Sequence, residues 1–251
     1  MLPLLHTSAH LSELTSVGSW DALLLVCPSS LAGVSPELRE VITEAQRFDE
    51  RLTRSGQAQL CRAPHAPGGR LLLALVGDLK GDCDDVRVWR DAATSAMRLA
   101  LDIGAQRPAL WVTGVPSDHE GQGSGAQGAY LKARHERARE AATLGALSAL
   151  WHPLEAREQA RGRTLEAFGL CLEGAEGELG AQGEAGEGAR EAWSRWLMGV
   201  EQGRCLARDV AGTEPERMAP PKAEELCKRV FKNSAVKVEV LKDSNELVRD
   251  Y

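Results

Sequence analysis

Apolar runs alternate with amphipathic segments along most of the chain. Four runs are almost wholly apolar, as expected of buried strands, and they cover residues 21–27, 70–77, 109–114 and 164–172. Between them, apolar residues recur every three or four positions, which predicts helices over residues 36–52, 86–103 and 130–151. Strands that alternate with helices form mainly parallel sheets with helices on both faces, so this pattern predicts an α/β domain.

A long amphipathic helix is predicted over residues 187–212. Its apolar face contains Trp193, Trp196, Leu197 and Val200, and charged residues occupy the positions between them. The preceding segment, residues 173–188, is rich in glycine and glutamate, and we expect a mobile loop there.

The prolines of residues 212–221 prevent this helix from continuing. A second helix is predicted over 221–231, and the alternation of Val236, Val238 and Val240 is typical of a strand. One helix and one strand bury too little surface for a core, so these residues indicate the beginning of a truncated second α/β domain. The predicted organisation is an amino-terminal domain (residues 1–186), a linker helix (187–212) and an incomplete second domain (213–251).

Composition and charge narrow the possible partners. The chain is 43% hydrophobic, enough for a substantial core, and its net charge of −6 comes from intermixed acidic and basic residues. We therefore expect no nucleic-acid partner, because phosphate binding needs a concentrated basic surface. Apolar runs stay shorter than a membrane span and the opening residues lack a signal-peptide pattern. The six cysteines are scattered, which favours free thiols and a cytoplasmic location.

The segment after the long helix resembles the junction between the two domains of the leucyl aminopeptidase family, also called cytosol aminopeptidases. The resemblance rests on the order LARD, a joint with Thr213, Pro215, Met218 and Pro220, a helix, and then VKVEVL. It is close over about residues 199–247 and only architectural before them. It implies an amino-terminal domain of macro-domain-like fold, an interdomain helix and the start of the catalytic domain. Gly212 and Glu216 replace the asparagines usual in this joint, which indicates a divergent member.

The resemblance also implies an activity for the complete protein. Full-length members are metallopeptidases that remove amino-terminal residues from peptides with two divalent ions, zinc or manganese, and they assemble as hexamers. Their metal ligands lie in segments such as KGVCFDSGG and NTDAEGRL, and neither occurs in this sequence. We therefore expect this chain alone to carry no catalytic or metal-binding residues and to be inactive, with peptide substrates and metals belonging to the full-length enzyme.

One alternative is a stand-alone binding or regulatory module that takes a phosphate-bearing ligand or docks on an aminopeptidase subunit. Gly123, Gly125 and Gly128 form a GxGxxG pattern before a helix, which can present backbone N–H groups to a phosphate. The pattern stands about nine residues after its strand, whereas a dinucleotide site needs it almost at once. A flexible surface loop is therefore the preferred interpretation of these glycines, and the ligand site is the weaker one.

The other candidate groups have simpler explanations. Asp78, Asp82, Asp84 and Asp85 could attract a cation, but helix capping is the better interpretation. Cys27 ends a strand and is expected to be an inert core thiol, and Ser124 lacks the GxSxG context of a nucleophile. The histidines have no short metal-binding spacing; they are His6, His10, His65, His119, His135 and His152.

The apolar face of the long helix has two interpretations. Trp193, Trp196, Leu197 and Val200 could pack on their own domain, or they could form a subunit or interdomain interface in a homo-oligomer. Both could hold together, and the sequence alone does not separate them.

Overall fold

The computed structural model describes residues 2–16, 20–81, 83–116, 126–159, 164–175, 177–180, 183–242 and 248. These residues form two compact units. The first comprises residues 1–151 and 162–203, and the second comprises residues 152–161 and 204–251. The predicted division at residues 186 and 212 stays a prediction.

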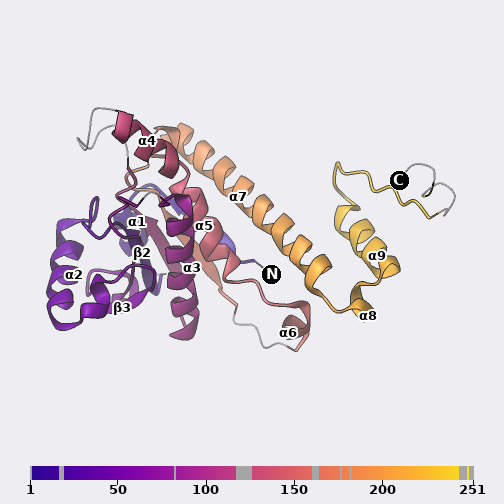
Figure 1. Cartoon of the computed structure of the whole chain (residues 1–251), viewed down its shortest axis with the longest axis horizontal. Coiled ribbons are helices and arrows are strands. Elements are labelled where there is room, and N and C mark those ends of the chain that lie inside the picture. Colours follow the sequence, from indigo (N-terminus) through magenta and orange to yellow (C-terminus); the bar gives the residue numbers. More distant parts are fainter. Residues whose placement is uncertain are drawn as a thin grey trace. The chain divides into compact units, whose positions relative to one another are not determined.

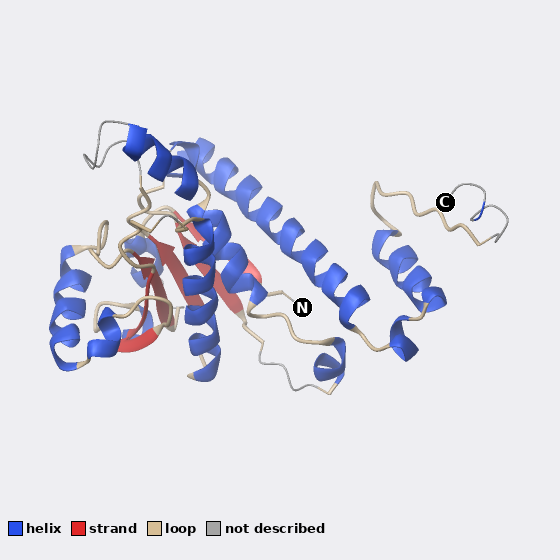
Figure 2. Ribbon diagram, in the orientation of Figure 1, coloured by secondary structure: helices blue, strands red, loops and turns tan. Residues whose placement is uncertain are grey.

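A six-stranded sheet forms the centre of the first unit (Figures 1 and 2). The strands lie in the order β1-β6-β5-β2-β4-β3, and all neighbours are parallel except β3 and β4. The prediction of a mainly parallel α/β sheet is therefore confirmed. The strand bounds are β1 Leu4–Ser8, β2 Ala22–Cys27, β3 Gln59–Arg62, β4 Arg70–Leu75, β5 Pro108–Val112 and β6 Ala167–Cys171.

Helices connect the strands and cover both faces of the sheet. The main helices of the first unit are α1 Leu11–Ser16, α2 Pro36–Phe48, α3 Val86–Asp102, α4 Ala126–His135, α5 Ala138–Ser148 and the first part of α7 Gly183–Gly212. Short 3₁₀ turns are η1 Glu50–Thr53, η2 Pro67–Gly69 and η3 Gly177–Gly180. Asp85 caps α3, since its carboxylate accepts the Arg87 backbone N–H at 2.8 Å, so the capping interpretation of the aspartates is confirmed for this residue.

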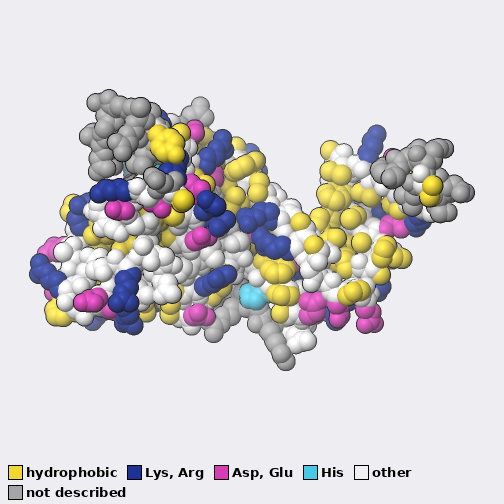
Figure 3. All heavy atoms as spheres, in the orientation of Figure 1, with side chains coloured by type: hydrophobic (Ala, Val, Ile, Leu, Met, Phe, Trp, Pro, Cys, Tyr) yellow, Lys and Arg dark blue, Asp and Glu magenta, His cyan; other side chains and the backbone are white. Residues whose placement is uncertain are grey.

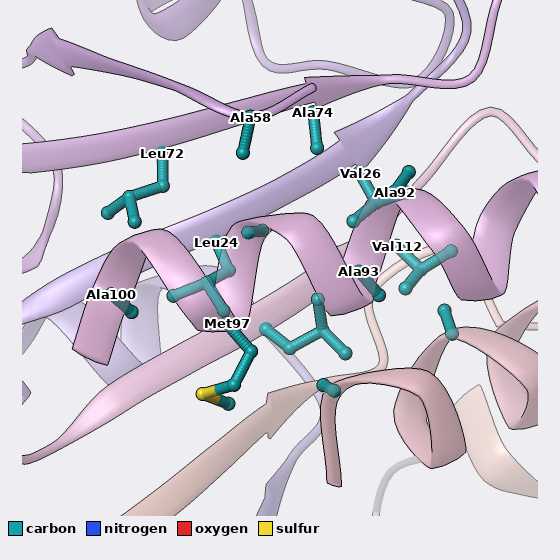
Figure 4. Packing of buried hydrophobic residues seen from close by; sticks show 14 of the residues in the cluster. Leu24, Val26, Ala58, Leu72, Ala74, Ala92, Ala93, Met97, Ala100 and Val112 are labelled. Atoms are coloured by element: carbon teal, nitrogen blue, oxygen red, sulfur yellow. The ribbon is translucent and has the colours of Figure 1, made fainter. Parts of the chain in front are cut away.

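Alternate residues of the strands supply two separate cores. On one face Leu24, Val26 and Leu110 pack against α3 and α5, whereas Leu23 and Leu25 face α2 on the other. Figure 4 shows the first of these cores, where the side chains from α3 are mostly alanines. Small side chains let helices lie close to each other and to the sheet, which is why a chain so poor in aromatic residues still forms a dense interior.

Helices α3 and α5 meet at a glycine. A Cβ atom on Gly145 would lie 2.3 Å from the backbone oxygen of Arg90, a distance that no side chain tolerates. The Thr94 hydroxyl lies 3.0 Å from the Gly145 carbonyl oxygen at the same crossing. The α3–α5 contact therefore depends on the absence of a side chain at residue 145.

Some details of the first unit differ from the sequence prediction. Strands β1 and β3 were missed; they lie at the two edges of the sheet, where Leu4 and Leu60 are exposed and the apolar pattern is incomplete. The helix predicted over residues 130–151 is interrupted between α4 and α5. The loop predicted over residues 173–188 contains η3 and the first residues of α7, because glycine content lowers helix propensity without forbidding a helix.

The second unit is helical in its described part. It contains α6 Leu154–Glu158, residues 204–212 of α7, α8 Pro215–Met218 and α9 Pro220–Phe231. Arg157 pairs with Asp209 at 2.6 Å, and Arg217 pairs with Glu158.

The strand predicted around Val236, Val238 and Val240 is not formed, and these three valines are 36–53% exposed. A single strand has no ladder partner, so alternation by itself does not produce one. The described residues of this unit therefore contain helices but no sheet.

Candidate functional site

A pocket lies at the carboxyl ends of β5 and β6 in the first unit. It has a volume of about 390 Å³, and its lining comes from the loops after β2, β5 and β6 and from α4, α5 and α7. The chain leaves β2 toward α2 on one face of the sheet and leaves the neighbouring β5 toward α5 on the other face. Such a switch point opens a crevice beyond the strand ends, where α/β proteins bind ligands.

Two glycines bring the loops at the bottom of this pocket together. Gly33 follows β2 and Gly114 follows β5, and both have positive φ angles, 69° and 66°. A Cβ on Gly33 would lie 2.2 Å from Thr113 Oγ1, and one on Gly114 would lie 2.5 Å from the carbonyl oxygen of Ala32. Larger residues at either position would push the loops apart and deform the pocket.

Backbone contacts hold the β6 side of the pocket. The Arg139 guanidinium donates to the Gly174 carbonyl oxygen at 2.5 Å, and Trp111 Nε1 donates to the Glu173 carbonyl oxygen at 3.4 Å. The Glu173 carboxylate accepts the Leu11 backbone N–H at 2.7 Å, so it also ties α1 to this loop. The loop after β6 is thus fixed from three directions.

Charged side chains of both signs stand on the helical wall. Lys132 lies on α4, Glu136 in the turn after it, and Arg139 and Glu140 in the first turn of α5. Figure 1 shows α4, α5 and the start of α7 together at this end of the sheet. Trp193 of α7 and Leu179 of η3 add an apolar side to the lining.

The candidate cysteine is buried and unreactive. Cys27 ends β2 and is fully buried, and burial raises the pKa of its thiol to about 12. Cys171 at the end of β6 behaves in the same way, with its pKa also raised to about 12 by burial. Because the thiolate is the nucleophile, neither cysteine suits covalent catalysis, and the core interpretation of Cys27 is confirmed.

His135 is the fully buried histidine of the described chain. Its Nδ1 accepts the indole N–H of Trp89 at 3.2 Å, which places the remaining proton of the neutral ring on Nε2. Burial lowers the pKa of this imidazole, and the Arg134 charge lowers it further. His135 therefore acts as a neutral core residue beside α3.

No set of three His, Cys, Asp or Glu side chains converges to hold a metal ion within the described ranges. His119 and Asp82 lie outside those ranges. The described residues do not fit the two divalent ions that the family resemblance implies, so no catalytic step through a metal is assigned to this part of the protein.

The glycines of the predicted phosphate loop lie mostly outside the described residues. Gly123, Gly125 and Ser124 lie outside the described residues, and Gly128 falls in the first turn of α4. The ligand role of the three glycines stays a prediction. The pocket residues Lys132, Arg139 and Glu140 were missed in the sequence, although the loops after the strands were the signal that could have pointed to this edge.

Some residues of the predicted apolar face of α7 are buried, and others are exposed to solvent. Leu197 is fully buried and Trp193 packs against the core, whereas Trp196 is 49% exposed and Val200 is partly buried. Packing against the core of the first unit therefore explains Trp193. An interface role for this set stays a prediction.

The surface carries charges of both signs. On the face drawn in Figure 3, acidic and basic side chains are interspersed. In the part of the chain that the structure describes, no helix is long and apolar enough to cross a membrane.

Comparison with known proteins links the chain to aminopeptidases. No protein-family model matches it. A putative aminopeptidase of Caenorhabditis elegans is 30% identical over 185 residues, which cover 74% of this chain and 30% of the relative. The chain thus spans less than a third of that relative's length.

Solved structures give the fold. A mutant of tomato leucine aminopeptidase aligns with 92% of this chain and 43% of its own, with a TM-score of 0.59 and 15% identity. The macrodomain of Thermus aquaticus DarG aligns with 67% of this chain at a TM-score of 0.36, too low to establish a common fold. Over most of its length the chain is thus a distant sequence relative of a putative aminopeptidase, and it shares its fold with a leucine aminopeptidase.

Proposed function

We propose that this chain is the amino-terminal, non-catalytic portion of a leucyl-aminopeptidase-like metallopeptidase that removes amino-terminal residues from peptides. The observation that carries the proposal is the unequal coverage of the sequence match. It includes 74% of this chain but only 30% of the C. elegans relative. The match thus includes most of this chain and leaves most of the relative unmatched.

The catalytic half would hold the metals. Two divalent ions, zinc or manganese, are expected from the family, and the segments that bind them there have no counterpart in this sequence. In the complete enzyme such ions would polarise the peptide carbonyl and activate a water. The contribution of this chain is then structural: it supplies the amino-terminal domain and the helix that leads to the catalytic one.

Residues 213–251 are proposed to begin the catalytic domain. Helix α9 is amphipathic, yet none of its residues is buried, and the valines after it are exposed. An apolar helix face and a strand-like segment of this kind need further elements to cover them. In the isolated chain, amide hydrogen exchange over residues 236–241 should be fast. Strong protection there would show that the segment is already paired.

The direct test is a peptidase assay on the pure chain. With a leucyl anilide substrate and manganese or zinc, we expect no release of leucine above the background without protein. A full-length aminopeptidase under the same conditions serves as the positive control. Turnover by this chain at a rate near that control would overturn the proposal.

Assembly is part of the same proposal. We expect the full-length protein to be a cytoplasmic homo-oligomer, a hexamer by family resemblance, and Trp196 is the exposed member of the predicted interface set. Light scattering after size exclusion would measure the mass. A monomer at micromolar concentration would contradict the expected assembly.

The alternative is a stand-alone binding or regulatory module. The pocket at the carboxyl ends of β5 and β6 favours a binding role, because crevices at this place in α/β sheets are common ligand sites. In this alternative the chain either recognises a phosphate-bearing ligand through the glycine-rich segment of residues 121–128 or docks on an aminopeptidase subunit. Thermal shift with ADP-ribose and related nucleotides tests the ligand version, and co-purification with a full-length subunit tests the docking version.

A further inference from the structure

The pocket beyond β5 and β6 has a lining that the proposed structural role does not use. Its volume of about 390 Å³ falls in the range of small-molecule sites. Its bottom is formed by loops that Gly33 and Gly114 hold in close contact, so its shape is fixed by backbone as well as by side chains. This fixed shape makes the chemistry of the lining informative about a ligand.

The charges of the helical wall are balanced. Lys132 and Arg139 are cationic, and Glu136 and Glu140 are anionic, while the Glu173 carboxylate already bonds the Leu11 N–H. A ligand with one sign of charge, such as phosphate, would meet repulsion from half of this wall. A ligand with an ammonium and a carboxylate a few bonds apart would find an opposite charge for each.

One positive and one negative side chain lie near the end of α4, and another such pair lies at the start of α5. Lys132 lies in the last turn of α4 and Glu136 directly follows that helix, and Arg139 and Glu140 are neighbours at the start of α5. The Glu140 side chain is 20% exposed, and Arg139 is held at the rim by its bond to the Gly174 carbonyl oxygen. Lys132, Arg139 and Glu140 are therefore partly shielded from water, where an ion pair with a ligand is stronger than on an open surface, whereas Glu136 is exposed.

The opposite side of the pocket is apolar. Trp193 and Leu179 line it, and the buried Trp111 lies below them with its indole N–H bonded to the Glu173 carbonyl oxygen. An aliphatic side chain placed here would lose contact with water and gain contact with these rings.

We propose that this pocket binds a free amino acid with an apolar side chain. The carboxylate faces Lys132 and Arg139, the ammonium faces Glu136 and Glu140, and the side chain lies against Trp193. This binding role goes beyond the structural role of the domain, and it does not depend on whether the chain is part of a peptidase. Such a site would make the domain a sensor of amino acids.

Calorimetry on the pure chain tests the chemistry of the ligand. L-leucine is the probe, and leucinamide and N-acetyl-leucine each lack one of its two charges. We expect one leucine molecule to bind per chain. Each blocked analogue should bind with an affinity at least about tenfold lower, the usual effect of losing a charged hydrogen bond. Equal binding of all three, or no binding of leucine at millimolar concentration, would overturn the proposal. Binding of inorganic phosphate without leucine would make the pocket an anion site instead.

Two variants test the location. Lys132→Met and Glu140→Gln each remove one charge from the wall, and both should weaken leucine binding about tenfold while the chain keeps the circular-dichroism spectrum of the folded wild type. Lys80→Met is the matched control, since Lys80 is 82% exposed and lies outside the pocket lining. Unchanged leucine affinity in both pocket variants would place the binding elsewhere and overturn the assignment. Because the peptidase assay has a different readout, failure of this proposal leaves the proposed function intact.

Discussion

Replacing Gly145 by alanine should destabilise the first unit, although alanine is the better helix former. The added Cβ would lie 2.3 Å from the Arg90 carbonyl oxygen and 3.0 Å from the Arg90 Cα. Ordinary contact begins at 3.4 Å, so α3 and α5 must separate by about 1 Å. The obstacle is backbone, which cannot rotate away as a side chain can.

The magnitude follows from two opposing effects. Forcing an extra methyl group into a well-packed site costs about 1–3 kcal/mol, and a backbone obstacle places this site at the upper end of that range. Alanine in place of glycine within a helix returns about 1 kcal/mol. The expected result for Gly145→Ala is therefore a free energy of unfolding lower by about 2 kcal/mol.

The same substitution at Gly199 is the matched control. A Cβ there meets nothing within 4 Å, and the residue is exposed on α7 in the same compact unit. Gly199→Ala should raise the free energy of unfolding by about 1 kcal/mol.

Urea unfolding followed by circular dichroism measures the difference between the two variants, which we expect to be about 3 kcal/mol. If Gly145→Ala is neutral or stabilising, the close approach of α3 and α5 is not required and the packing argument fails. If both variants are destabilised alike, helix propensity does not act on α7 as stated.

Two further predictions concern titratable groups in the core. Burial lowers the pKa of His135, whose neutral ring accepts the Trp89 N–H, so its contribution to stability is complete above the ordinary histidine pKa of about 6.5 and is lost as the pH falls through the lowered value. Urea midpoints measured from about pH 7.5 to about pH 5 should therefore fall more steeply for the wild type than for His135→Leu, and equal slopes would contradict this role. Burial raises the pKa of Cys27 and Cys171 to about 12, so iodoacetamide at about pH 8 should leave both intact in the native chain while it alkylates the exposed Cys83. Digestion and mass spectrometry locate the adducts, and modification of Cys27 as fast as Cys83 would show that β2 opens readily.

The buried strands of the fold could be predicted because they are apolar without interruption. Strands β2, β4, β5 and β6 are covered on both faces, so nearly every position must be apolar, and such runs are visible in the sequence. The edge strands β1 and β3 carry exposed residues and polar neighbours, and their pairing depends on partners distant in the sequence. No local pattern reports that pairing.

The candidate site was harder to predict for a related reason. Thr113, Glu173 and Lys132 lie far apart in the sequence and share a pocket only because parallel strands end at one edge of the sheet. The glycine pattern of residues 123–128 gave a stronger local signal but falls mostly outside the described residues. The exposed valines of residues 236–240 show the converse case, in which a clear alternation forms no strand because no partner is present in the described chain.

The exposed edges of the sheet have a consequence for handling the protein in solution. Leu4 on β1 is 68% exposed and Leu60 on β3 is 49% exposed, and each outer strand offers backbone groups to any extended segment that meets it. Chains produced at high concentration can therefore associate edge to edge and precipitate. Leu60→Lys would place a charge on the edge strand and should improve solubility, because natural sheet proteins often carry lysine on their edge strands for this purpose.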